Sequence, residues 1–373
     1  MFDLVIRGGR NIAGDPVEVG VIDGKIAAVG PRIEGEAARE MMLEPGQYLS
    51  AGWIDDHVHC FQEMSLYYDY PDEIGYKKGV CTVVDAGTTG ADNIARFHEV
   101  ASSSITNVFA LVNIAKTGIV AQDELSDTSR IQEDLVRGAL EDNAGFAVGI
   151  KARMSASVVK QSGVEPLRMA KRIQRDLGGV PLMVHIGSEP PRLEDVLALM
   201  GEGDILTHCF NGKRNGIADL SDASAPVIKQ FARAAYESGV VFDVGHGTDS
   251  FNFDVAALAH ASGIDAASIS TDIYIRNRTA GPVYDLATTM EKLRLVGYGW
   301  EQIIAAVTSV PARNLRLKGK GALEPEADAD LTVFELCSGT KKLVDSNGNE
   351  RTAHELVVPV RTILKGVSYD CQL

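Results

Sequence analysis

The sequence predicts an α/β fold: a (β/α)8 TIM barrel joined to a small β-sandwich domain built from both ends of the chain. Three observations predict it. Short apolar runs alternate with amphipathic helical patterns through the middle of the chain, both ends instead carry β-type runs with tight turns, and 373 residues suffice for one large and one smaller domain. We therefore expect the barrel over residues 51–322 and the composite domain over residues 1–50 and 323–373.

The two ends of the chain are predicted to be antiparallel β-structure. Residues 4–6, 17–22 and 26–29 are short β-type runs, and Asp23-Gly24 is a strong two-residue hairpin pattern. The same texture returns after Leu323, with an Asn347-Gly348 turn and a valine-rich run over residues 355–367. We expect these two parts to pack as one β-domain.

The barrel is predicted from eight strands, over residues 54–59, 80–85, 108–113, 146–151, 182–185, 204–208, 240–243 and 267–272. Residues 167–177 and 227–236 are expected to be helices, because each places its apolar residues on one face. A doubly wound open sheet is the competing architecture, and no GxGxxG pattern follows the first strand to support its dinucleotide-binding form. In a (β/α)8 barrel the active-site groups come from the C-terminal ends of the strands.

Composition excludes several classes of function. The chain has 36 basic and 51 acidic residues, a formal charge of −15, which repels nucleic acid and anionic lipid. No apolar run is long enough to cross a bilayer, and the first residues carry no secretory pattern. The five cysteines show no CxxC or regular spacing. We expect a cytoplasmic protein without nucleic-acid or membrane partners.

Histidines and one carboxylate fall at the predicted strand ends. His57 and His59 flank one residue of the first strand, so the period of two places both imidazoles on the same face. This pair alone is ambiguous, since two histidines on a solvent-facing strand would look the same. His185, His208 and Asp272 close the fifth, sixth and eighth strands. Imidazole and carboxylate ligands suit zinc, or in some settings manganese, iron or nickel.

Lys151 ends the fourth predicted strand, at the same level. Its positive charge would oppose metal binding unless carbon dioxide converted the amine to a carbamate. Carboxylated at N6, Lys151 would be an anionic oxygen donor able to bridge two metal ions, which would make the site binuclear. The alternatives are a surface lysine at the start of a loop and a lysine that binds a substrate anion.

Residues 52–59, Gly-Trp-Ile-Asp-Asp-His-Val-His, resemble the opening motif of the amidohydrolase superfamily. The resemblance covers nearly the whole chain, because members commonly carry a composite β-sandwich made from both termini, and residues 328–333 are similar to its return strand. It implies a metal-dependent hydrolase of amides, esters or related carbon centres. The residues that resemble its binuclear ligand set, in chain order, are His57, His59, Lys151, His185, His208 and Asp272.

Residues 149–153, 207–212 and 243–247 are similar to a dihydroorotase-related subgroup whose members often bear dihydroorotase or adenine deaminase names. Dihydroorotases place an arginine two residues after the second histidine, where this chain has Phe61. Adenosine-type deaminases generally use one metal ion, lack the bridging lysine and place a glutamate three residues after the fifth-strand histidine, where this chain has Ser188. The resemblance points instead to removal of an acyl group, foremost acetyl, from an ester or amide of a small α-hydroxy or α-amino acid.

Three alternatives stay open: a dihydroorotase-like cyclic-amide hydrolase, a heterocycle deaminase and a non-catalytic scaffold. Retention of all six candidate ligands argues against the scaffold. The resemblance implies two divalent ions, foremost Zn2+, that share a bridging hydroxide. His57, His59 and Asp272 would hold the inner ion, His185 and His208 the outer one, and carboxylated Lys151 would bridge them. Asp272 is the predicted catalytic residue, as general acid and base.

Three residues are predicted to contact the substrate, a small molecule expected to carry a carboxylate. Arg153 follows Lys151 by two residues and could grip that carboxylate, or form a salt bridge on the rim. His246 lies between two glycines after the seventh strand and could bind substrate, or make a structural hydrogen bond. Tyr274 lies on a rim loop. A homo-oligomer is compatible with the sequence, which sets no subunit number.

Overall fold

The computed structural model describes residues 1–222 and 224–372, and a parallel sheet of seven strands forms its centre. The strand order is β14-β11-β10-β9-β8-β7-β6, with every neighbouring pair parallel. The strands are β6 (Trp53–Val58), β7 (Val80–Ala86), β8 (Asn107–Asn113), β9 (Ala147–Met154), β10 (Leu182–Ile186), β11 (Ile205–Thr207) and β14 (Val241–Phe242). Seven of the eight predicted barrel strands are therefore present, with shifted ends.

The eighth position of the barrel is filled by an irregular segment. Val58 pairs with Ile273, and Asp243 pairs with Ser268, both as isolated parallel bridges. The prediction of a regular strand over residues 267–272 was therefore wrong in form, although the segment closes the ring. One physical reason is that the Thr271 backbone N–H donates to a carboxylate oxygen of Asp55 at 3.0 Å and not to a strand carbonyl.

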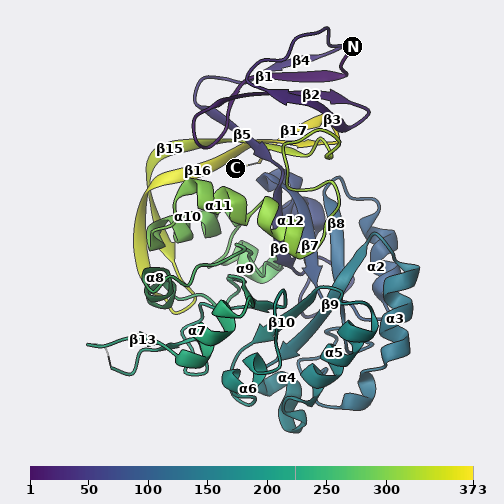
Figure 1. The fold of residues 1–373 in the computed structure, drawn as a ribbon, viewed down its shortest axis with the longest axis vertical. Coiled ribbons are helices and arrows are strands. Elements are labelled where there is room, and N and C mark those ends of the chain that lie inside the picture. Colours follow the sequence, from purple (N-terminus) through teal and green to yellow (C-terminus); the bar gives the residue numbers. More distant parts are fainter. Residues whose placement is uncertain (223, 373) are drawn as a thin grey trace.

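Helices follow most of the barrel strands, and α2, α3 and α5 lie on the outer side of the sheet (Figure 1). The predicted helix over residues 167–177 is confirmed as α5. The predicted helix over residues 227–236 begins later, because β13 (Val227–Ile228) pairs with β12 (Ala218–Asp219) before α7 starts. The helices are α1 (Pro71–Ile74), α2 (Ile94–Ala101), α3 (Glu133–Asp142), α4 (Ala156–Val159), α5 (Glu165–Asp176), α6 (Leu193–Leu197), α7 (Gln230–Glu237), α8 (Phe253–Ala261), α9 (Ile275–Thr279), α10 (Leu286–Val296), α11 (Trp300–Ala306) and α12 (Ser309–Asn314).

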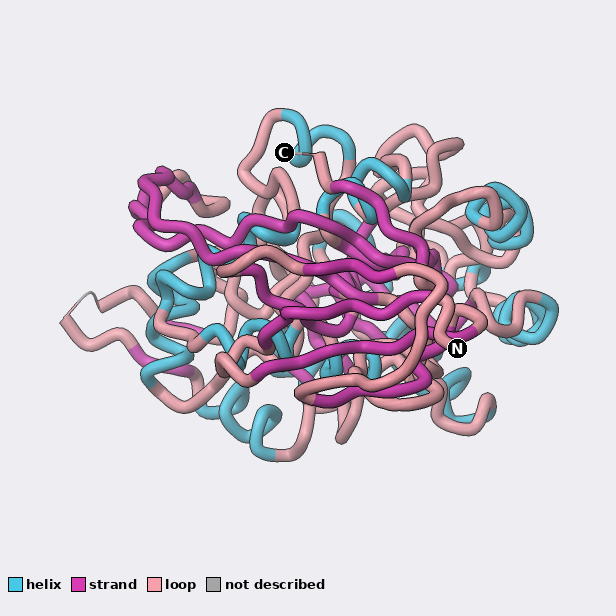
Figure 2. The backbone as a smooth tube through the Cα atoms, turned by 90° about the horizontal axis from the view of Figure 1, so that it is seen from above, coloured by secondary structure: helices cyan, strands magenta, loops and turns pink. Residues whose placement is uncertain are grey.

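Both ends of the chain join in a second sheet of eight strands, ordered β17-β16-β15-β5-β1-β2-β3 with β4 beside β1. Seen from above, its strands run side by side across the molecule (Figure 2). Leu4, Val19 and Ile26 from one end pack with Leu331 and Ile363 from the other in a separate apolar core. The strands are β1 (Leu4–Arg10), β2 (Pro16–Ile22), β3 (Lys25–Gly30), β4 (Glu40–Met42), β5 (Gln47–Ala51), β15 (Leu331–Val344), β16 (Glu350–Leu364) and β17 (Val367–Asp370).

The turn between β15 and β16 reaches the loop that follows β14. Ser346 donates its backbone N–H to the Phe251 carbonyl at 3.0 Å, and Asp345 accepts the Phe253 N–H at 3.0 Å. The C-terminal hairpin thereby braces residues 248–250, which line the main pocket.

Within residues 1–222 and 224–372, none of the helices has the length and apolar character needed to cross a bilayer.

Candidate metal centre and pocket

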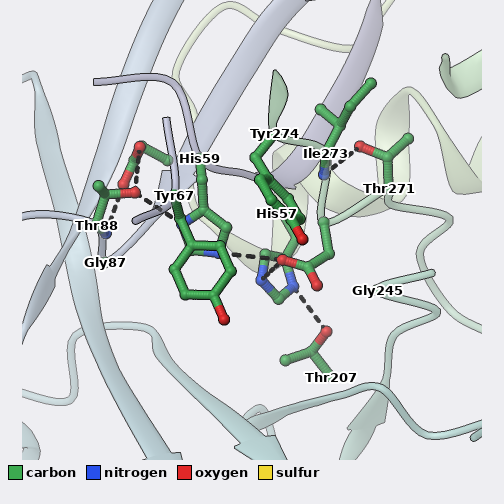
Figure 3. A network of polar contacts seen from close by, with 12 residues as sticks. His57, His59, Tyr67, Gly87, Thr88, Thr207, Gly245, Thr271, Ile273 and Tyr274 are labelled. Carbon is green, nitrogen blue, oxygen red and sulfur yellow. Dashed lines mark hydrogen bonds and ion pairs between the residues drawn. The ribbon is translucent and has the colours of Figure 1, made fainter. Parts of the chain in front are cut away.

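Four of the predicted ligands, Asp272 among them, meet at the C-terminal ends of the strands. His57 Nε2 lies 3.4 Å and His59 Nε2 3.1 Å from Asp272 Oδ1. Lys151, on β9, places Nζ 3.2 Å from His57 Nε2. Figure 3 shows the rings of His57 and His59 close together. The alternation along β6 and the residue that follows it therefore brings both imidazoles to one point.

The remaining two histidines complete the group. The ring centroid of His208 lies 5.0 Å from that of His57 and 4.5 Å from that of His185. His57, His208 and Asp272 each offer a ligand atom, and these atoms all lie within 4.8 Å of one another. The structure thus places all six predicted ligands in one cluster. His208 and Asp272 both adopt positive φ, +68° and +49°, which is uncommon outside glycine and is found where surrounding structure fixes a functional side chain.

The far side of the His59 ring is held by a hydroxyl and a carboxylate. Thr88 Oγ1 lies 2.7 Å from His59 Nδ1 and donates its own hydrogen to Asp85 Oδ2 at 2.8 Å (Figure 3). Because that hydroxyl hydrogen is already used, Thr88 can only accept from the ring, so Nδ1 carries the proton. Nε2, on the other side of the ring, then faces Asp272. Such outer hydrogen bonds fix the tautomer of metal-binding histidines.

His57 and His208 are held in the same way. Thr207 Oγ1 lies 2.8 Å from His57 Nδ1 and donates to Asp243 Oδ2 at 2.7 Å. His208 Nδ1 lies 2.6 Å from the Gly245 carbonyl oxygen, which can only accept. Both rings therefore present an unprotonated Nε2 to the cluster. His208 Nε2 is buried and has no hydrogen-bond partner in the part of the chain that the structure describes.

Burial sets the charges of these groups. It lowers the pKa of His57 and His185 well below the ordinary histidine range and that of His208 to about 4, so the rings are neutral at pH 7. Burial works to raise the pKa of Asp272, but its contact with His59 and the influence of neighbouring groups, Lys151 among them, outweigh burial and lower that pKa. A carboxylate among neutral imidazoles, with one Nε2 unpartnered, is a donor set that fits Zn2+.

Lys151 is buried in the same cluster. Burial lowers the pKa of its amine to about 7, and Nζ lies 3.0 Å from Met183 Sδ. A neutral amine is the form that reacts with carbon dioxide to give a carbamate and a proton. The surface-lysine alternative does not fit, because the residue is 1% exposed.

The glycines on either side of His246 pack against the cluster. A Cβ on Gly247 (φ +54°) would lie 2.4 Å from Asp272 Oδ2, and one on Gly245 (φ +48°) would lie 2.9 Å from His208 Nδ1. Both positions therefore need glycine so that the backbone can approach the candidate ligands.

His246 itself is not among the residues that line the pocket, and its contacts agree with the second predicted role, a structural hydrogen bond. Its side chain is fully buried and stacks on Phe251 at 4.8 Å. Nδ1 donates to the Gly247 carbonyl at 2.9 Å, and Nε2 accepts from Lys292 Nζ at 2.8 Å. Both ring nitrogens are therefore engaged in hydrogen bonds inside the protein, which fits a structural role for this histidine.

A cavity of about 390 Å³ opens beside His185 and Asp272. Tyr274 lines it, with its hydroxyl 3.1 Å from Thr248 Oγ1, and Tyr67 packs edge-on against Tyr274 at 5.0 Å. The volume lies toward the small end of the range for ligand pockets, about 300 to 1,000 Å³. The pocket therefore suits a small molecule.

Arg153 also lines the cavity, but its charge is already paired. Nη1 donates to both carboxylate oxygens of Glu124, at 2.9 and 3.1 Å, and Nη2 donates to Gln122 at 3.2 Å. The salt-bridge alternative is thus the arrangement present. Nothing in the sequence near Arg153 indicates this partner, because Arg153 lies in β9 and Glu124 lies in the loop after β8.

In sequence, the chain is similar to a family model and to proteins whose names contain the word deacetylase. A family model described as a deacetylase-like composite domain matches residues 323–370. A protein named deacetylase from Enterococcus faecalis is 59% identical over 99% of each chain. Deacetylase Atu3266 from Agrobacterium fabrum is 37% identical, over 90% of this chain and 82% of its own.

Solved structures agree on the fold but differ in name. The crystal structure of an adenine deaminase superposes with a TM-score of 0.97 at 59% identity, covering 99% of this chain and 100% of that one. The crystal structure of a dihydroorotase gives a TM-score of 0.88 at 33% identity, covering 99% of both. The chain therefore belongs to the amidohydrolase superfamily of hydrolases, in the group whose curated relatives carry the name deacetylase.

Proposed function

We propose that this protein is a metal-dependent deacetylase that hydrolyses an acetyl ester or amide of a small α-hydroxy or α-amino acid. The observation that carries the proposal is the convergence of the His57 and His59 imidazoles on the Asp272 carboxylate beside a pocket of about 390 Å³. The names of the relatives support the acetyl group as the one removed. The small cavity supports a small acid as its carrier.

The residues of the cluster would hold two divalent ions, foremost Zn2+. His57, His59 and Asp272 would hold one, His185 and His208 the other, and Lys151, carboxylated at Nζ, would bind both. When bound, such a pair supplies an activated water molecule and polarises the carbonyl that is attacked. The burial of Lys151 and its pKa of about 7 support the carboxylation, because the amine is neutral far more often than an exposed lysine.

Asp272 would move the proton. Its side chain is 19% exposed and lines the pocket, so it can reach both the attacking water and the substrate. Oδ1 is engaged by His57 and His59, while Oδ2 lies toward Gly247. The lowered pKa of Asp272 keeps it ionised as a base at pH 7, and it would pass the accepted proton to the leaving oxygen or nitrogen.

Two residues disfavour the other activities that appear among the relatives' names. Phe61 stands where dihydroorotases carry a carboxylate-binding arginine, and it is buried against Phe97 at 4.9 Å. Ser188 stands where the deaminases carry a catalytic glutamate, and it lines the pocket. Neither side chain can supply the charge that those reactions use at these positions.

The test is a substrate panel with zinc-loaded enzyme. The panel contains O-acetyllactate and N-acetylalanine of both hands, dihydroorotate and adenine, with acetate, ring opening and ammonia measured separately. We expect acetate release from at least one acetylated acid to be the fastest reaction. Faster ammonia release from adenine, or faster opening of dihydroorotate, would overturn the proposal.

A further inference from the structure

Two cationic side chains line the pocket, Arg153 and Lys213, and their surroundings differ. Arg153 is 7% exposed, and Glu124, which is 1% exposed, takes up its charge through two hydrogen bonds. A second carboxylate on this guanidinium would have to share it with the buried Glu124, and the like charges would repel each other. Arg153 is therefore a poor binder of a further anion.

Lys213 lies in the loop between β11 and β12, and its charge is not taken up. With the residues that the structure describes, its ammonium forms neither an ion pair nor a side-chain hydrogen bond. Asp249 and Asp272 act on it only through their charges, and Asp249 is itself exposed at the pocket mouth. Burial lowers the pKa of Lys213. A half-buried ammonium without a partner is unfavourable, and an arriving anion would relieve this cost.

Lys213 lines the same pocket as His185 and Asp272, two residues of the cluster. In an acylated α-hydroxy or α-amino acid, the carboxylate and the acyl oxygen or nitrogen are joined to the same carbon. A carboxylate on Lys213 would therefore leave the acyl group next to the metal-binding cluster.

We infer that Lys213, and not Arg153, binds the carboxylate of the substrate and so selects acids over their neutral analogues. The inference rests on the proposed function for the identity of the reaction, but the binding of a carboxylate can be measured without turnover. Lysine suits this role, because it presents a compact charge with three donors.

The kinetic experiment compares O-acetyllactate with its uncharged methyl ester as substrates of the zinc-loaded enzyme. Lys213→Met removes the charge and keeps much of the apolar stem, Lys213→Arg keeps the charge, and Lys318→Met removes a charge from an exposed lysine outside the pocket. For O-acetyllactate we expect Lys213→Met to raise KM by about tenfold to a hundredfold, the range for a charge-assisted hydrogen bond, with kcat much less affected. Its KM for the methyl ester should stay unchanged. Lys213→Arg should restore most of the preference for the acid, and Lys318→Met should behave as wild type.

A second readout uses binding alone, by calorimetry with lactate and lactamide. We expect Lys213→Met to weaken lactate binding about tenfold or more and to leave lactamide binding unchanged. Equal losses for acid and ester, or an unchanged KM for the acid, would overturn the inference while leaving the deacetylase standing. Lactate binding that depends on Lys213, in an enzyme that releases no acetate, would refute the proposed function and support the inference.

Discussion

Replacing Thr88 by valine tests whether the contacts behind the histidine rings set metal affinity. Valine has nearly the shape of threonine, so the change removes one hydroxyl and little else. That hydroxyl accepts from His59 Nδ1 at 2.7 Å and donates to Asp85 at 2.8 Å. Without it the proton of His59 is free to move to Nε2, the nitrogen that faces the cluster.

The expected loss of metal affinity in Thr88→Val can be worked out from the hydrogen-bonding groups that lose their partner. The ring N–H of His59 becomes a buried donor without a partner, which costs about 1 to 3 kcal/mol. Asp85 keeps the backbone N–H groups of Cys60 and Thr88, at 2.9 and 2.8 Å, so its own loss is smaller. A cost of this size corresponds to metal binding weakened by about tenfold to a hundredfold.

Thr89 provides the matched control. It is the next residue, it is equally buried, and its hydroxyl has no hydrogen-bond partner within the described residues. Thr89→Val should therefore leave metal affinity and the free energy of unfolding unchanged or slightly improved. Zinc affinity is measured by calorimetry on metal-stripped protein, together with thermal unfolding. Equal zinc affinity in the two variants would refute the account of the outer hydrogen bonds.

Two further predictions concern the charges of the cluster. Asp272→Asn should lower kcat by about a hundredfold to ten-thousandfold while elemental analysis still finds most of the metal, because an amide oxygen can bind a metal ion but the side chain cannot take the proton; metal loss in proportion to activity loss would make Asp272 a ligand only. The second prediction is acid instability of the metal-free protein. The folded-state pKa of His208 is about 4 against an ordinary 6.5, so below pH 6.5 the unfolded chain binds a proton that the folded chain does not. Stability should therefore fall, by about 1.4 kcal/mol per pH unit for this histidine, as the pH drops from 6.5 toward 4. Urea unfolding at several pH values measures it, and a flat profile over that interval would contradict the burial of a neutral ring.

The residues at the strand ends could be predicted because two simple patterns meet there. Apolar runs of five to eight residues mark buried strands, and a histidine or lysine at the end of such a run has few structural reasons to be there. The strand predicted over residues 267–272 is an exception, because the structure has only isolated β-bridges at this segment. Its polar residues bond to carboxylates, as Ser268 and Ser270 do to Asp243, and this competes with a regular ladder.

The pocket walls could not be read from the sequence in the same way. The charge of Arg153 is neutralised by Glu124, which lies 29 residues away in the sequence. Lys213 has no ion-pair partner among the described residues, and this too depends on how the loops are arranged in the fold. The Gly-His-Gly pattern predicts a close approach of the backbone to another group, and the structure shows that the groups approached are Asp272 and His208. Pairings between loops are set by the tertiary fold, so local patterns carry no trace of them.

We propose that the cluster binds two metal ions and that carboxylated Lys151 binds both of them. Elemental analysis of protein purified with zinc and bicarbonate tests it most directly, on wild type and Lys151→Met side by side. We expect close to two divalent ions per chain in the wild type and loss of the pair in Lys151→Met, with activity partly restored by added short carboxylates. A single ion in both proteins would contradict the account.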